Sequence, residues 1–95
     1  MYAKNDKRRL YELINLYLSE TITILSFCDE FYYSFIEIDP NDYTEIETEV
    51  FYELNDISNR FSQYEEDHKL DSHAFYTEID VRKKIIEIKK KLKSS

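Results

Sequence analysis

The sequence contains no glycine and only one proline, Pro40. Every turn must therefore be made by Asn, Asp, Ser or ordinary residues, which suits helical hairpins better than tight β-turns. The loops that cradle phosphates in nucleotide-binding enzymes also require glycine, so the P-loop and the dinucleotide-binding fingerprint are excluded. These two scarcities favour a helical protein that does not use nucleotides.

Cysteine and long apolar runs are also scarce. The one cysteine, Cys28, cannot form a disulfide within the chain. The sequence shows neither the apolar stretch of a signal peptide nor an unbroken run of about 18 apolar residues that could span a bilayer. We therefore expect a cytoplasmic protein that does not bind a membrane.

The chain does contain enough apolar mass for a packed core. Of its 95 residues, 42% are hydrophobic, and nine Tyr and six Phe are among them. A chain of this length buries only roughly two-thirds of the surface that its unfolded form exposes, so a large internal pocket is not expected. We predict one helical domain that spans residues 1–95, without a linker or an internal repeat.

Charge is distributed unevenly along the chain, which carries a net charge of −7. Residues 1–9 carry a net +3 and residues 82–95 a net +6, whereas residues 10–81 carry a net −16. The lysines near the C-terminus could bind nucleic acid or a membrane surface, but neutralising a helix C-terminus and pairing with acids of other helices are their more ordinary roles. The polyanionic middle indicates a basic protein partner, and we expect no direct binding of nucleic acid.

Apolar residues at helical spacing predict a first helix over residues 5–18 and a second that ends near Ile38. The hydroxyl of Thr23 can cap the second helix by accepting a hydrogen bond from an amide of its first turn. Pro40 marks the break after this helix, because proline forces the residue before it out of the helical region and donates no backbone hydrogen bond.

The strongest helical pattern follows the proline. Asp42 and Glu45 resemble a capping box that opens a third helix. Its apolar residues recur at helical spacing, and we expect it to end near Tyr64. Residues 65–72 are polar, acidic and unpatterned, which predicts a loop.

The last predicted helix runs to about residue 92, with lysines in its final turns that complement the helix dipole. Thr77 or Asp80 can cap its start. Four amphipathic helices joined by short connections fit an all-α fold, an antiparallel four-helix bundle, because short loops place successive helices side by side. The alternative is a three-helix core with a loosely attached first helix.

Acidic residues form a stripe along the third predicted helix. Four carboxylates recur at steps of four, four and three, on Glu45, Glu49, Glu53 and Asp56. Repulsion between like charges at this spacing costs about 0.2–0.5 kcal/mol per pair, so stability alone would not select the stripe. Carboxylates with interspersed tyrosines suit capture of a basic protein, because the acids steer association and Tyr supplies contact area at low entropy cost. The alternative interpretation is an ordinary solvated face.

The candidate partner-binding surface continues from this helix into the acidic segment after it. Its carboxylates are expected to meet Lys, Arg and His side chains of the partner, while two tyrosines supply packed anchors. The predicted set is Glu49, Tyr52, Glu53, Asp56, Tyr64, Glu65, Glu66, Asp67 and Asp71. A homodimer is a further option if the tyrosines exceed what the bundle can bury.

No catalytic or metal-binding constellation stands out in the sequence. Glu65 and His68 have the Glu-x-x-His spacing of di-iron bundles, but such a site needs two of these elements and two further glutamates. His68 and His73 could act as the acid and base of a nuclease, yet their acidic surroundings would repel RNA. Cys28 lies on an apolar stripe and is expected to be a small core residue. We therefore expect no cofactor, no metal and no enzymatic activity.

The order and spacing of several motifs are similar to those of a known family. The motifs are Ile22-Thr23-x-x-x-Phe27, the pair Phe31-Tyr32, Leu54-Asn55-Asp56 followed by Phe61 and Tyr64, the acidic connection Glu65 to Asp71, and Tyr76-Thr77-Glu78-Ile79-Asp80 before a basic helix. Over residues 9–92 this pattern resembles the colicin D immunity protein family, which is also found beside toxins of contact-dependent growth inhibition systems. The family pattern often has a glycine before its Ile-Thr pair, where this chain has Glu20-Thr21.

The resemblance implies a four-helix bundle that binds the nuclease domain of its cognate toxin and blocks the active site. In that family, acidic side chains stand in for the phosphates of the tRNA substrate. We therefore expect an immunity protein that neutralises a cognate antibacterial, tRNA-cleaving nuclease by covering its basic cleft. The alternative is an acidic nucleic-acid mimic or an adaptor that acts on another basic partner.

Overall fold

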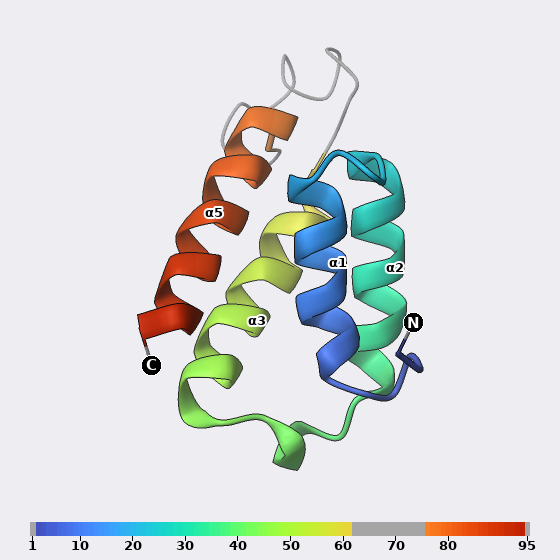
Figure 1. The fold of residues 1–95 in the computed structure, drawn as a ribbon, viewed down its shortest axis with the longest axis vertical. Helices are drawn as coiled ribbons and strands as arrows, with labels where there is room; N and C mark the ends of the chain where they lie inside the picture. Colours follow the sequence, from blue (N-terminus) through green and yellow to red (C-terminus); the bar gives the residue numbers. More distant parts are fainter. Residues whose placement is uncertain (1, 62–75, 95) are drawn as a thin grey trace.

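The computed structural model describes residues 2–61 and 76–94. In these residues it contains four α-helices and one 3-10 turn, namely α1 (Arg8–Leu18), α2 (Ile24–Glu37), η1 (Pro40–Asp42), α3 (Glu45–Asn59) and α5 (Glu78–Ser94). Successive helices run in opposite directions (Figure 1). Both α1 and α3 pack beside α2 and α5. The predicted all-α, antiparallel four-helix bundle is confirmed.

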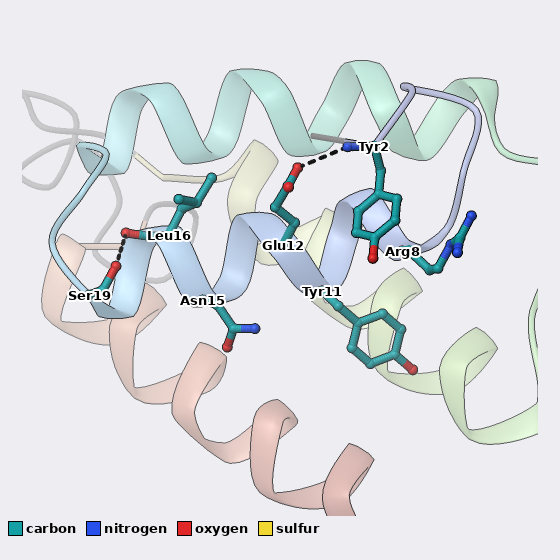
Figure 2. A pocket seen from close by; sticks show the side chains of 7 residues that line it. All are labelled: Tyr2, Arg8, Tyr11, Glu12, Asn15, Leu16 and Ser19. Atoms are coloured by element: carbon teal, nitrogen blue, oxygen red, sulfur yellow. Dashed lines mark hydrogen bonds between the residues drawn. The ribbon is translucent and has the colours of Figure 1, made fainter.

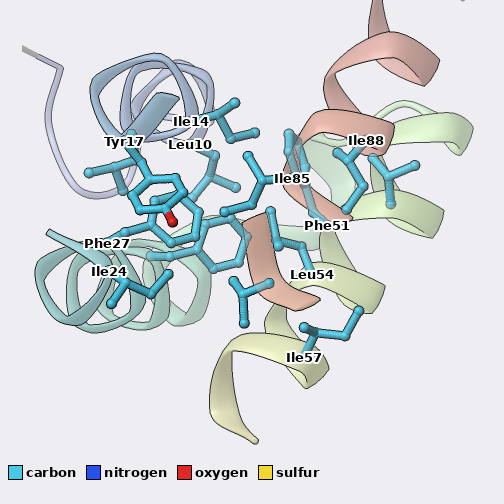
Figure 3. Packing of buried hydrophobic residues seen from close by; sticks show 14 of the residues in the cluster. Leu10, Ile14, Tyr17, Ile24, Phe27, Phe51, Leu54, Ile57, Ile85 and Ile88 are labelled. Carbon is cyan, nitrogen blue, oxygen red and sulfur yellow. The ribbon is translucent and has the colours of Figure 1, made fainter. Parts of the chain in front are cut away.

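One hydrophobic core lies between the four helices (Figure 3). Its side chains come from every helix, and most of them are at most 2% exposed, among them Leu10, Ile14, Phe27, Leu54 and Ile85. Full burial of one such side chain contributes about 1.5–3 kcal/mol to stability. Since α1 supplies its own share of this core, the alternative of a loosely attached first helix is wrong.

The first helix begins later than predicted. It starts at Arg8 instead of near residue 5, because Asp6 holds the preceding chain in a turn. The Asp6 carboxylate accepts hydrogen bonds from the backbone amide of Arg8, at 2.9 Å, and from its guanidinium, at 2.7 Å. These bonds hold the pKa of Asp6 below its ordinary value. An acceptor at this position satisfies an amide of the first turn that has no partner inside the helix.

The connection between α1 and α2 is a Schellman motif with an unusual residue at its turn. The Thr21 amide donates to the Leu16 carbonyl at 2.9 Å, and the Glu20 amide donates to the Tyr17 carbonyl at 2.9 Å. Glu20 has a φ of 63°, which is the left-handed region that glycine normally occupies.

The predicted limits of the second helix are confirmed. The Thr23 hydroxyl accepts a hydrogen bond from the Ser26 amide at 3.2 Å, which caps the start of α2. At the other end Ile38 is extended, and so is Asp39, the residue before Pro40. The proline therefore ends the helix as the sequence indicates.

The predicted start of the third helix is wrong by two residues. Asp42 belongs to the 3-10 turn, and the capping box is formed by Thr44 and Glu47. The Glu47 amide donates to the Thr44 hydroxyl at 3.2 Å, and the Thr44 amide donates to the Glu47 carboxylate at 2.8 Å. Glu45, the partner expected for Asp42, is an exposed residue of the first turn.

The third helix also ends earlier than predicted, at Asn59 instead of near residue 64. After this point the Tyr76 amide donates to the Arg60 carbonyl at 2.9 Å, which ties the start of the last helical segment to the end of α3. Thr77 caps α5 as predicted, because the Asp80 amide donates to its hydroxyl at 3.3 Å while the Thr77 amide donates to the Asp80 carboxylate at 3.1 Å.

Candidate protein-binding surface

The exposed side of α3 carries the carboxylates expected from the sequence. Glu45, Glu49, Tyr52 and Asp56 are all exposed and lie on one face of the helix. Among the described residues, no basic side chain forms an ion pair with Glu45 or Glu49. Asp56 contacts Arg60 at 3.5 Å, and both side chains are more than half exposed, so this pair contributes little to stability. These carboxylates are therefore available to a partner.

Glu53 lies at the edge of this face and has a different role in the isolated protein. Its carboxylate contacts the Lys84 ammonium of α5 at 2.7 Å. This hydrogen bond raises the pKa of Lys84, which also contacts Glu87 at 3.3 Å. Glu53 thus joins α3 to α5, and the expectation that basic residues near the C-terminus pair with acids of another helix is confirmed at Lys84.

Five residues of the predicted partner-binding set lie outside the described part of the chain. They are Tyr64, Glu65, Glu66, Asp67 and Asp71, and the two histidines, His68 and His73, lie outside it as well. The described portion of the predicted surface therefore consists of Glu49, Tyr52, Glu53 and Asp56 on α3.

A row of exposed apolar side chains on α2 was not predicted. Leu25, Tyr32, Tyr33 and Ile36 are 46%, 41%, 52% and 57% exposed. The signal was present in the sequence, because Leu25, Tyr32 and Ile36 follow the buried stripe of α2 at a shift of one residue, which makes this helix apolar on two sides. A helix with a second apolar side in a small bundle presents that side to solvent or to a partner.

The apolar side of α2 and the acidic side of α3 meet along one seam. The ring of Phe35 on α2 contacts the ring of Tyr52 on α3 edge-on, with centroids 4.9 Å apart. Phe35 also stacks on Tyr43 at 6.1 Å, just before α3. Exposed aromatic groups with adjacent carboxylates therefore form one continuous surface, which we name the α2–α3 face and define by Leu25, Asp29, Tyr32, Ile36, Glu45, Glu49, Tyr52 and Asp56.

The α2–α3 face contains a groove of about 300 Å³ near the end of α3. The groove is lined by Leu25, Cys28, Asp29, Tyr32, Tyr33, Ser58, Asn59 and Phe61. Half of these residues are aromatic or aliphatic, and Asp29 supplies an exposed carboxylate. Its composition matches the apolar centre and polar rim of protein-binding sites.

Cys28 lies in the wall of this groove and packs against the core. Burial of the thiol raises its pKa to about 11. The thiol is therefore protonated at neutral pH, and it lacks the thiolate that a nucleophile needs. This agrees with its expected role as a small packing residue.

The carboxylate of Glu47 has a structural role. Glu47 is only 5% exposed and accepts hydrogen bonds from Lys7 at 2.9 Å and from the hydroxyl of Tyr11. Burial alone would raise the pKa of Glu47, but these bonds and the one from the Thr44 amide hold it below its ordinary value. The charge of Glu47 is thus used to join the start of α3 to α1.

A larger pocket, of about 550 Å³, lies on the outer side of α1 (Figure 2). Its charged groups are already engaged within the chain. The Arg8 guanidinium binds Asp6 and lies 4.6 Å from the centroid of the Tyr2 ring, while the Tyr2 amide donates to Glu12 at 3.4 Å. The pocket therefore offers a ligand few free polar groups, in contrast to the α2–α3 face.

The geometry assigns no metal or membrane segment within the described residues. In residues 2–61 and 76–94, no three His, Cys, Asp or Glu side chains are grouped so that they could hold a metal ion. None of the helices in this part of the chain combines the length and apolar character needed to cross a bilayer. No family model, curated protein or solved structure matches this chain. The α2–α3 face is therefore the candidate functional site.

Proposed function

We propose that the protein is an immunity protein, which neutralises an antibacterial, tRNA-cleaving nuclease toxin by binding the basic cleft of that toxin through the α2–α3 face. The observation that carries this proposal is the meeting of two features on one surface. Glu45 and Glu49 form no ion pair with a described residue. They lie beside the exposed Tyr52 and the apolar side of α2.

Electrostatic complementarity is the first reason to expect a basic partner. A nuclease must bind the phosphates of its RNA, so its cleft is rich in Lys and Arg. A fixed acidic surface steers such a cleft into contact and raises the association rate well above that of a neutral pair. The net charge of −16 over residues 10–81 provides this field.

Aromatic contact area is the second reason. Interfaces are enriched in Tyr and depleted in Glu and Asp at their centre, with charges at the rim. On the α2–α3 face the exposed Tyr52 lies at the seam between the two helices, where its ring contacts Phe35, and the carboxylates of α3 lie on the same exposed side of that helix. A merely solvated acidic face would not need the exposed apolar residues of α2. The resemblance of the sequence to colicin D immunity proteins supports a nuclease as the partner.

The proposal is tested with the protein encoded by the gene immediately upstream, where a toxin gene is expected. Purified wild-type protein should bind that protein in isothermal titration calorimetry. The double variant Glu45→Lys/Glu49→Lys should bind it at least about 100-fold more weakly, because each reversed charge adds repulsion to a lost attraction.

The matched control is a double reversal on another surface, Glu20→Lys/Glu37→Lys, which changes the net charge by the same amount at two exposed carboxylates that form no ion pair with a described residue. Equal loss of affinity in both double variants would show that only total charge matters. Absence of binding by the wild-type protein would refute the toxin as partner and favour a nucleic-acid mimic or adaptor that acts on a different basic protein.

A further inference from the structure

The groove in the α2–α3 face has a more specific feature than acidity. We propose that it anchors one cationic side chain, an Arg or Lys of the toxin, between aromatic rings and a carboxylate. This inference rests on the proposed function, because it names the contact through which the same surface holds its partner. It assigns the recognition to α2, whereas the sequence indicated only α3 and the segment after it.

The aromatic wall provides the first part of the argument. Tyr32, Tyr33 and Phe61 line the groove, and Tyr32 is 41% exposed although its neighbours in the core are fully buried. The rings of Tyr32 and Tyr33 lie edge-to-face with centroids 5.5 Å apart, which fixes the two side chains relative to each other. The ring faces carry negative charge density and attract a cation within about 6 Å of a ring centroid.

One ring of the tyrosine pair already contacts a cation of the same chain. The Lys4 ammonium lies 5.6 Å from the centroid of the Tyr33 ring, so the outer ring of the pair is in contact with a cation in the isolated protein. Tyr32, on the α3 side of the pair, lines the groove and has no such contact among the described residues. The second ring is therefore open to a cation from a partner.

The charge of the groove favours binding of a cationic side chain and disfavours binding of an apolar one. Asp29 lines it, is exposed, and forms no ion pair with a described residue. Carboxylates of α3 lie along the same face, and Glu45 and Glu49 among them form no ion pair with a described residue, whereas Asp56 contacts Arg60. An apolar side chain in this groove would desolvate Asp29 without a compensating bond, whereas a guanidinium or ammonium would pair with it.

Substitutions at Tyr32 distinguish a cation site from an apolar one. Tyr32→Phe keeps the ring and should leave toxin affinity within about threefold of wild type. Tyr32→Leu keeps apolar area but removes the ring, and should weaken binding at least about tenfold, as should Asp29→Asn. Tyr2→Leu, which removes another exposed tyrosine away from the face, is the matched control and should leave binding unchanged.

Each outcome of these toxin-binding measurements either supports or overturns the inference. Equal affinities of the Leu and Phe variants at position 32 would show an apolar anchor and overturn the inference, while the proposed function stands because the wild-type protein still binds. A wild-type protein that binds no toxin would instead refute the proposed function itself. If light scattering shows a dimer that Tyr32→Leu converts to a monomer, the groove holds a second copy of this chain and the inference is wrong. Thermal melting of each variant verifies that the bundle is intact.

Discussion

Replacing Glu47 by Ala tests whether one buried carboxylate holds the start of α3 against α1. Glu47 accepts hydrogen bonds from the Thr44 amide at 2.8 Å, from Lys7 at 2.9 Å and from Tyr11. Loss of its part of the capping box costs about 1 kcal/mol. Hydrogen bonds to a charged group contribute about 1.5–3 kcal/mol each, but Lys7 is 32% exposed and regains water when its partner is removed.

The sum for Glu47→Ala is a loss of about 2–4 kcal/mol, a large part of the about 5–15 kcal/mol that stabilises a typical domain. The free energy of unfolding is measured by urea denaturation at neutral pH. Glu49→Ala is the matched control, because it removes the same side chain from an exposed position two residues away and should change stability by less than about 0.5 kcal/mol. If the two variants are equally stable, the link between α1 and α3 is not made through Glu47.

The remaining predictions concern three single residues. Because the folded-state pKa of Glu47 lies below its ordinary value of 4.5, its charge stabilises the protein above that pH and the stabilisation is lost as the pH falls through the folded pKa. The difference in unfolding free energy between wild type and Glu47→Gln should accordingly be constant near neutral pH and shrink in urea titrations below pH 4.5. Glu20→Gly should raise the free energy of unfolding by about 0.5–1 kcal/mol, since a glycine adopts the observed φ of 63° without strain; a less stable variant in thermal melts would contradict the Schellman geometry. Cys28, with a pKa of about 11, should react with a disulfide reagent at neutral pH at least about 100-fold more slowly than in urea-unfolded protein; equal rates would show that the thiol is not held in the wall of the groove.

The helices and the core could be predicted because they follow from local periodicity. The buried residues of α1 and α2 recur at helical spacing, and the hydroxyl of Thr23 caps α2 as its residue type indicates. Pro40 ends the helical hairpin through its own covalent structure, whatever surrounds it. These features do not depend on contacts that are distant in sequence.

The start of α3 could not be predicted because two capping boxes compete in the sequence. Asp42 and Thr44 are each followed three residues later by a glutamate, and local rules favour both. The structure selects Thr44, whose partner Glu47 also binds Lys7 and Tyr11 from the first part of the chain. A contact across about 40 residues therefore decides a choice that appears local.

Only part of the candidate surface could be predicted, because the rest depends on contacts between residues that are distant in sequence. Spacing correctly places Glu49, Tyr52 and Asp56 on an exposed face of α3. Spacing does not reveal that Glu53 pairs with Lys84 of α5, nor that the apolar side of α2 lies beside Tyr52, because both depend on how the helices pack.

The proposal that this protein blocks a nuclease is tested most directly by titrating it into a tRNA-cleavage assay with the protein encoded immediately upstream, which is the proposed toxin. Cleavage should fall linearly and stop at one molecule of this protein per toxin, whereas the Glu45→Lys/Glu49→Lys variant should leave cleavage largely intact at the same ratio. Undiminished cleavage in the presence of excess wild-type protein would show that the protein does not inhibit this nuclease.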